Sequence, residues 1–117
     1  MDPQELKDRT EAFALPVLRC AHSLPRSRAT DILAKQLMRA ATSVGANYRA
    51  ACRARSKADF VSKITIVEEE ADESAYWLEL IATHANADKQ ETGALIEEAH
   101  QLTAIFTASG RTATRNR

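Results

Sequence analysis

The chain has 117 residues, a length that suits one domain, and its 16 basic and 16 acidic residues give a formal net charge of zero. A neutral chain has no overall field that would draw it onto nucleic acid or an anionic membrane. Only three glycines and three prolines occur, and the remaining residues favour helix, so the composition predicts an all-α protein. With no long apolar run and no secretion signal, we expect a cytoplasmic protein without membrane contact.

The first predicted helix covers residues 3–23. Asp2 and Glu5 form a capping pair around Pro3, which takes the first helical position. We expect Pro16 to bend this helix, because its ring removes one backbone hydrogen bond. The apolar residues of the helix recur at helical spacing: Leu6, Phe13, Val17, Ala21 and Leu24.

The second predicted helix begins at Arg28 or Thr30 and ends near Ala54. Gly45 lies in its interior, where glycine costs about 1 kcal/mol relative to alanine. This cost predicts that a neighbouring backbone comes close to Gly45. The buried face is predicted to hold Leu33, Leu37, Ala40, Ala41, Val44, Tyr48 and Ala51.

The third predicted helix follows Ser56, which forms a capping pair with Asp59, and ends near His84 or Ala85. Its apolar stripe is the clearest in the chain: Phe60, Ile64, Val67, Ala71, Ala75, Leu78 and Ile81.

The fourth predicted helix follows the capping pair Asp88 and Glu91 and runs to Gly110. Its stripe is Leu95, Ala99, Leu102 and Phe106. Residues 111–117 are predicted to form a basic, flexible tail, so the domain covers residues 1–110. Short connections force neighbouring helices to run antiparallel, which predicts an up-down-up-down four-helix bundle.

Motifs for catalysis or metal binding are scarce. There is no glycine-rich phosphate loop and no nucleophile elbow, so we expect no enzyme activity, no cofactor and no small-molecule substrate. Glu97 and His100 have the spacing of one half of a di-iron site, but no second Glu-x-x-His occurs, and we expect no metal. Cys20 and Cys52 should lie roughly 30 Å apart at ~1.5 Å per residue, so we expect buried free thiols.

An acidic run, residues 68–73, lies in the third helix. If the second and third helices reverse near residue 55, these acids lie level with Arg39 and Lys35. We therefore expect ion pairs between the two helices and a solvated acidic face.

A group of basic residues gathers where the second helix ends and the third begins, with Asp59 as the one acid nearby on these two helices. Three interpretations stay open for this basic cluster. It can complement the negative end of the second helix, bind the phosphates of a nucleic acid, or pair with an acidic face of another subunit. The basic cluster consists of Arg49, Arg53, Arg55, Lys57 and Lys63.

Two stretches, residues 42–60 (TSVGANYRAACRARSKADF) and 69–80 (EEADESAYWLEL), resemble a known family. They are similar to the four-helix bundle proteins encoded in intervening sequences of bacterial 23S ribosomal RNA genes. Phe13-Ala14, Leu24-Pro25 and residues 104–106 extend the resemblance over nearly the whole chain. The resemblance implies a bacterial, cytosolic homopentamer. A related group, the accessory proteins of diversity-generating retroelements, has a similar pentameric barrel and is thought to bind nucleic acid and a reverse transcriptase; this chain departs from it in being neutral.

An oligomer also suits the residues themselves. The large core-forming residues are few, and one of the adjacent aromatic residues Tyr76 and Trp77 must face outward from the stripe of the third helix. The other interpretation of Trp77 is that it flanks its own bundle core. The predicted subunit interface holds Glu69, Asp72, Glu73, Tyr76 and Trp77.

Two functions follow as hypotheses. In the first, a homo-oligomer presents the basic cluster to RNA or DNA. In the second, the basic cluster pairs with the acidic third helix of a neighbouring subunit, and no nucleic acid binds.

Overall fold

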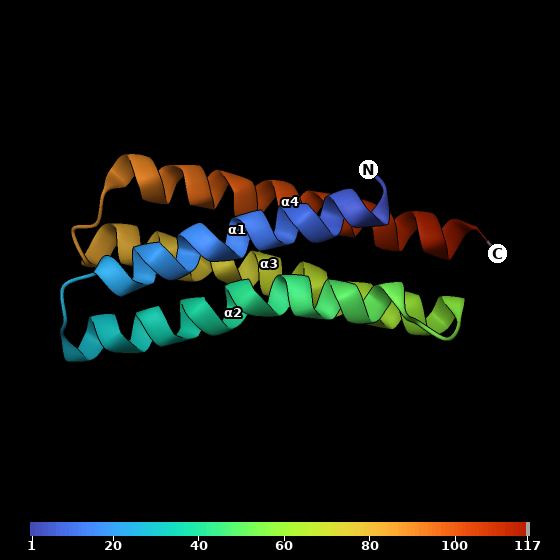
Figure 1. Ribbon diagram of the computed structural model, residues 1–117, viewed down its shortest axis with the longest axis horizontal. Coiled ribbons are helices and arrows are strands. Elements are labelled where there is room, and N and C mark those ends of the chain that lie inside the picture. The colour runs from blue at the N-terminus through green and yellow to red at the C-terminus, as the bar shows by residue number, and fades with distance from the viewer. Residues whose placement is uncertain (117) are drawn as a thin grey trace.

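The computed structural model describes residues 1–116 as four antiparallel helices. They are α1 (Pro3–Ser23), α2 (Arg28–Cys52), α3 (Lys57–His84) and α4 (Lys89–Arg115), and no strand occurs among the described residues. The helices form a rod of 49 × 23 × 19 Å, with the N-terminus, the α2–α3 turn and the end of α4 at one end (Figure 1). The predicted up-down-up-down four-helix bundle is confirmed.

Each helix begins at a side chain that accepts a hydrogen bond from a backbone N–H of the first turn. Asp2, Ser27, Ser56 and Asp88 occupy these N-cap positions. Such a bond satisfies one of the donors that a helix leaves unpaired at its start. In the α3–α4 turn Asn86 has a φ of 52°, a left-handed conformation that asparagine tolerates better than most residues.

The end of α4 differs from the prediction. Helix α4 does not stop at Gly110 but continues to Arg115, and Arg117 of the predicted tail lies outside the described residues. Gly110 keeps an ordinary helical backbone and lies on α3, where a Cβ added to it would be 3.2 Å from Ile64 Cγ2. Because α4 still has the first turns of α3 to pack against, a glycine at this position does not end the helix.

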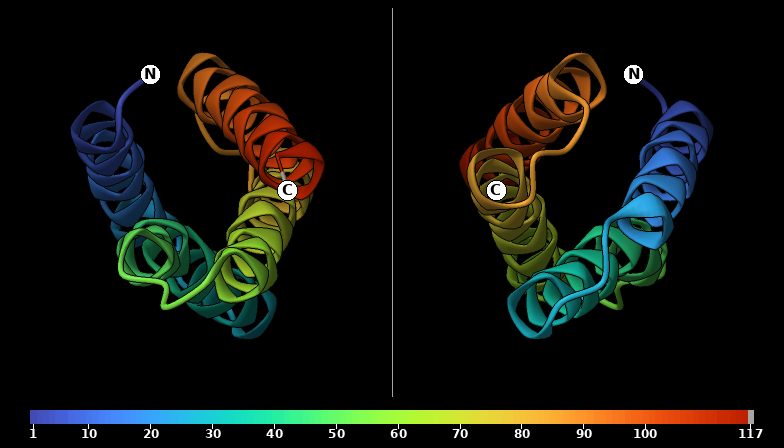
Figure 2. Two further views of the ribbon diagram at one scale, coloured as in Figure 1. Left: turned by 90° about the vertical axis from the view of Figure 1, so that its right-hand side faces the viewer. Right: turned by 90° about the vertical axis from the view of Figure 1, so that its left-hand side faces the viewer.

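The four apolar stripes meet in one core, and all the predicted stripe residues are buried except Leu33 and Phe60, which are half-buried. Helix α3 packs closely against both α2 and α4, whereas α1 and α4 make the weakest contact of the bundle. Figure 2 shows α1 and α4 diverging along the open side. Arg9 bridges this seam by donating to both carboxylate oxygens of Glu98 at 2.7 Å.

The prediction at Gly45 is confirmed, since the neighbour that comes close is α1 at Thr10. A Cβ added to Gly45 would lie 3.0 Å from Thr10 Oγ1 and 3.9 Å from the Thr10 carbonyl carbon. The absence of a side chain at Gly45 therefore sets the distance between α1 and α2.

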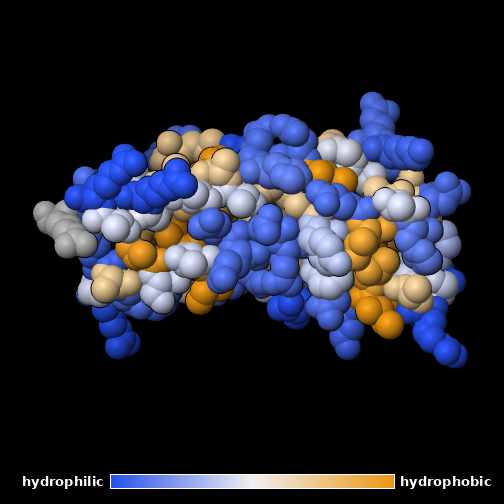
Figure 3. All heavy atoms as spheres, turned by 180° about the vertical axis from the view of Figure 1, so that it is seen from behind, coloured by the Kyte–Doolittle hydropathy of each residue, from blue (hydrophilic) through white to orange (hydrophobic). Residues whose placement is uncertain are grey.

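Some large apolar side chains stay exposed. Seen from the side opposite to Figure 1, hydrophobic side chains form separate groups with hydrophilic ones between them (Figure 3). None of the helices among residues 1–116 combines the length and the apolar character needed to cross a lipid bilayer. The exposed large apolar residues are Met1, Leu15, Ile32, Ile66 and Tyr76.

Candidate nucleic-acid interface

The basic cluster lies where the chain turns from α2 into α3. Arg49 is in the last turn of α2, Arg53 is its C-cap, and Lys57 is the first residue of α3. The turn is short because α2 ends at Cys52 and the Ser56 hydroxyl already accepts a hydrogen bond from Asp59 N–H, which starts α3. The cluster is thus held on two adjacent helices at one end of the rod.

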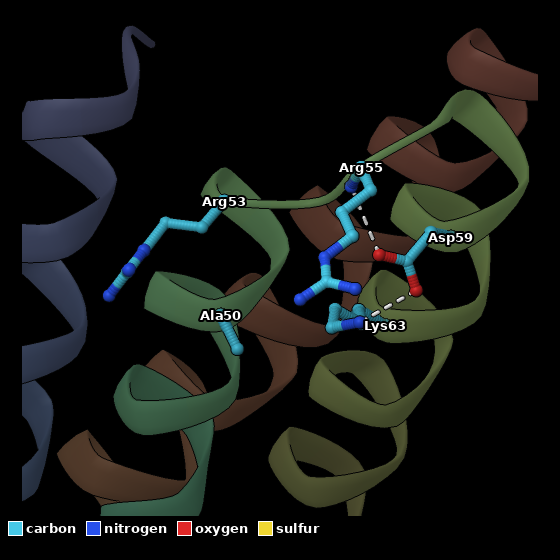
Figure 4. Close-up of a pocket in the computed structure, with 5 residues that line it drawn as sticks. All are labelled: Ala50, Arg53, Arg55, Asp59 and Lys63. Atoms are coloured by element: carbon cyan, nitrogen blue, oxygen red, sulfur yellow. Dashed lines mark hydrogen bonds and ion pairs between the residues drawn. The ribbon is translucent and has the colours of Figure 1, made fainter.

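Asp59 is the acid within this cluster, and its two oxygens are both occupied. Lys63 Nζ donates to Oδ1 at 2.6 Å, and the backbone N–H of Arg55 donates to Oδ2 at 3.1 Å (Figure 4). These two hydrogen bonds, the one from Lys63 first, lower the pKa of the Asp59 carboxyl. Asp59 therefore neutralises Lys63 and fixes the turn, and it leaves the charges of the other four residues unbalanced.

The other four residues are exposed, and none forms an ion pair with any residue between 1 and 116. In Figure 4 the Arg53 side chain extends towards α1, whereas the Arg55 side chain lies over the seam between α2 and α3. The four residues are Arg49, Arg53, Arg55 and Lys57. An open depression of about 490 Å³ is lined here by Ala50, Arg53, Arg55, Asp59 and Lys63.

One basic residue next to this cluster was not predicted. Lys7 of α1 joins Arg49 and Arg53 in lining a second depression, together with Ala46 and Ala50. Lys7 is half-buried and also forms no ion pair among the described residues. The antiparallel arrangement of α1 and α2 would have placed Lys7 at this end, but spacing along one helix gives no sign of it.

The acids of α3 are partly used within the chain. Arg39 lies 3.7 Å from Glu70 and 3.4 Å from Glu73, which confirms the predicted pairing of α2 with α3, although Lys35 takes no part in it. Burial raises the pKa of Glu70. Glu69 and Asp72 are exposed and form no ion pair with the rest of residues 1–116.

The two adjacent aromatic residues of α3 face different surroundings. Tyr76 is 52% exposed, whereas Trp77 is half-buried against the core, and their rings meet edge to face at 5.0 Å. Trp77 therefore flanks its own core and Tyr76 is the outward residue. The buried indole N–H of Trp77 finds no hydrogen-bond acceptor among the described residues, which is unusual for a buried tryptophan.

The residues considered for a metal site point to other partners. His100 Nε2 lies 3.3 Å from Glu79 of α3, and Glu97 accepts a hydrogen bond from Gln101. Within residues 1–116 no three His, Cys, Asp or Glu side chains come together in a way that could hold a metal ion. Both cysteines are free, as predicted, but only Cys20 is buried, whereas Cys52 is half-buried.

Comparison with known proteins identifies the family of this chain. The sequence model of one protein family, described as 23S rRNA-intervening sequence protein, matches residues 4–108. A solved structure from Bacteroides thetaiotaomicron VPI-5482, described as a protein of unknown function from the S23 ribosomal protein family, is 28% identical and superposes with a TM-score of 0.85. The match covers 95% of this chain and 99% of that one. No curated protein matches. The family match spans most of the chain, so the chain belongs to the 23S rRNA-intervening sequence protein family.

Proposed function

We propose that this protein is a non-enzymatic homo-oligomer, pentameric as the family resemblance implies, that binds RNA or DNA through the basic cluster at the α2–α3 end. The observation that carries the proposal is the set of four exposed cations, Arg49, Arg53, Arg55 and Lys57, without an acid to pair with among residues 1–116. Phosphate groups supply the missing negative charge, and guanidinium groups bind them with two hydrogen bonds.

The helix dipole alone does not account for this cluster. Cations near the end of α2 are stabilising, but the effect falls off within the last turn, where Arg49 and Arg53 already lie. Arg55 and Lys57 lie beyond that end, and Lys57 begins the next helix, whose start favours negative charge. Two cations at a helix start are mildly unfavourable, and Asp59, the acid of this first turn, is already paired with Lys63.

The same geometry supports a binding role without catalysis. Asp59, the acid in the depression at the cluster, accepts a hydrogen bond at each oxygen and has a lowered pKa, so it is a weak base. An assembly is supported by the exposed apolar residues Ile66 and Tyr76, which lie near the unpaired acids Glu69 and Asp72 on α3. The cytoplasmic location expected from the sequence stays a prediction.

Fluorescence anisotropy with a labelled 20-nucleotide RNA, titrated between 50 and 200 mM KCl, tests the proposal. We expect binding that weakens steeply with salt, and an Arg53→Ala, Arg55→Ala double variant with a salt slope smaller by about 1.4 on single strands. The matched control is Arg19→Ala, Arg28→Ala, which removes two exposed arginines near the α1–α2 turn, at the opposite end of the rod, and should bind as the wild type does.

Two outcomes would contradict the proposal. If the wild type binds neither RNA nor DNA at 50 mM KCl, the proposed nucleic-acid binding is wrong. A double variant that loses its oligomeric mass in light scattering while wild type binds no RNA would instead favour the second hypothesis, in which the cluster pairs with α3 acids of a neighbouring subunit.

A further inference from the structure

Three depressions adjoin one another near the α2–α3 end of the rod, and together they are called the trough. The depression between α2 and α3 shares Ala50 and Arg53 with the depression between α1 and α2. That second depression shares Lys7, Ala46 and Arg49 with a third, which continues along the α1–α2 seam. The trough therefore reaches from α3 over α2 to α1, with Ala50 and Arg53 standing where two of its depressions meet.

Charge is distributed unevenly along this trough. Its α3 end holds Lys63 and Asp59, which are paired with each other, and its middle holds cations only. Beyond Lys7 the lining turns acidic, with Asp8 and Glu11 facing the third depression. In order from α1 to α3, the basic residues that line the trough are Lys7, Arg49, Arg53, Arg55 and Lys63.

We infer that a single phosphodiester backbone lies along this trough from α3 to α1, that Lys7 of α1 binds it, and that Asp8 and Glu11 end the bound segment. The inference rests on the proposed function and extends the site to a third helix. The trough crosses three helices whose axes lie about 9 Å apart, a span of about 18 Å.

The lining residues also show which contacts a bound strand would lack. Among residues 1–116, no aromatic side chain lines any of the three depressions. Base stacking on aromatic rings is worth about 1–3 kcal/mol per base where it occurs, and here it is absent. Recognition then depends on the backbone alone, and the base sequence should matter little.

Anisotropy titrations with Lys7→Gln test the extension to α1. We expect several-fold weaker binding of 20-nucleotide oligouridine at 50 mM KCl, with a salt slope smaller by about 0.7, so that raising KCl to 200 mM weakens binding by about threefold less than in the wild type. Lys89→Gln is the matched control, since Lys89 is an exposed lysine and the first residue of α4, at the opposite end of the rod. Asp8→Asn should bind more tightly than the wild type, a gain that misfolding cannot produce.

The probes also distinguish a single-stranded from a double-stranded nucleic acid. Oligouridine and oligoadenosine of equal length should bind with similar affinity, and a 20-base-pair RNA duplex in a parallel titration shows whether one strand of a helix is accepted. If Lys7→Gln behaves like Lys89→Gln while the Arg53, Arg55 double variant is weakened, the extension to α1 is wrong and the proposed function stands. If the wild type binds none of the probes, both fail.

Discussion

Gly45 sets how closely α1 and α2 approach. Replacing it by alanine improves helix propensity but introduces a steric contact, so the two effects on stability oppose each other. An alanine in a helix interior is about 1 kcal/mol more stable than glycine. At Gly45 the new Cβ would lie 3.0 Å from Thr10 Oγ1, whereas at Gly93 it would meet no atom within 4 Å. We expect Gly93→Ala to raise the free energy of unfolding by about 0.5–1 kcal/mol and Gly45→Ala to lower it or leave it unchanged, as measured by urea denaturation.

The Thr10→Ala background identifies the cause. Removing the Thr10 hydroxyl leaves its Cβ as the nearest side-chain atom, at 3.4 Å, an ordinary contact distance. In that background Gly45→Ala should become stabilising, so the two substitutions couple by about 1 kcal/mol or more. Equal effects of Gly45→Ala in both backgrounds would show that Thr10 does not restrict this position.

The two thiols differ in burial and should differ in reactivity. Burial raises the pKa of the Cys20 thiol to about 11, so its nucleophilic thiolate is scarce near neutral pH, whereas Cys52 is half-buried. With Ellman's reagent at pH 8 we expect one thiol per native chain to react and both to react in urea. Cys52→Ala should abolish the fast reaction. A fast native reaction that survives this substitution would place the accessible thiol at Cys20.

At the scale of helices, the caps and stripes of the sequence predict the structure well, because both are local signals. Ser56 with Asp59, and Asp88 with Glu91, locate the starts of α3 and α4 correctly. The predicted end of α4 at Gly110 was wrong. Glycine at a helix end is a statistical signal, whereas the contact of Gly110 with Ile64 depends on which helix packs beside α4. Tertiary packing decided this boundary, and the sequence near it does not show that packing.

The start of α3 provides a test of pH dependence. The pKa of Asp59 is lowered in the folded protein, so its contribution to stability is complete above its ordinary pKa of 3.8 and is lost as the pH falls through the lower folded value. In urea denaturation between pH 2 and 6, we expect Asp59→Asn to be less stable than the wild type at pH 6 and to approach it at the acid limit.

Ser56→Ala is the control for this prediction, since it removes the cap of α3 without removing a titrating group. It should lower the free energy of unfolding by about 1 kcal/mol at every pH. If the free energies of unfolding of the wild type and of Asp59→Asn differ by the same amount from pH 2 to 6, the contacts of Asp59 with Lys63 and Arg55 do not stabilise the fold.

For the whole molecule, the sequence predicts which charges meet across adjacent helices but not the complete surface. The reversal near residue 55 was enough to gather the basic cluster and to pair Arg39 with the α3 acids. Lys7 was missed because the spacing of residues along α1 does not show that Lys7 lies beside Arg49 and Arg53 of α2. The stripe of α3 also left both interpretations of Trp77 open, and the structure shows Tyr76 exposed and Trp77 half-buried against the core.

The outward face of α3 is where we expect subunits to meet. Ile66, Glu69, Asp72 and Tyr76 follow each other at intervals of three or four residues, so they share one exposed face. An exposed tyrosine offers both a large ring and a hydroxyl to a partner, which suits it to an interface. Light scattering should give about 65 kDa, five times the 12.9 kDa of one chain, and Tyr76→Glu should reduce this mass to that of the monomer.

Leu15→Glu provides the matched control, because Leu15 of α1 is 49% exposed, close to the 52% of Tyr76, but lies on another helix. If Leu15→Glu dissociates the assembly and Tyr76→Glu does not, the interface is on α1 and the acids of α3 are free. A wild-type mass of 12.9 kDa would remove the assembly altogether. The basic cluster belongs to a single chain, so the Arg53→Ala, Arg55→Ala double variant would still test RNA binding by a monomer. Assembly and RNA binding, the two parts of the proposed function, can therefore fail separately.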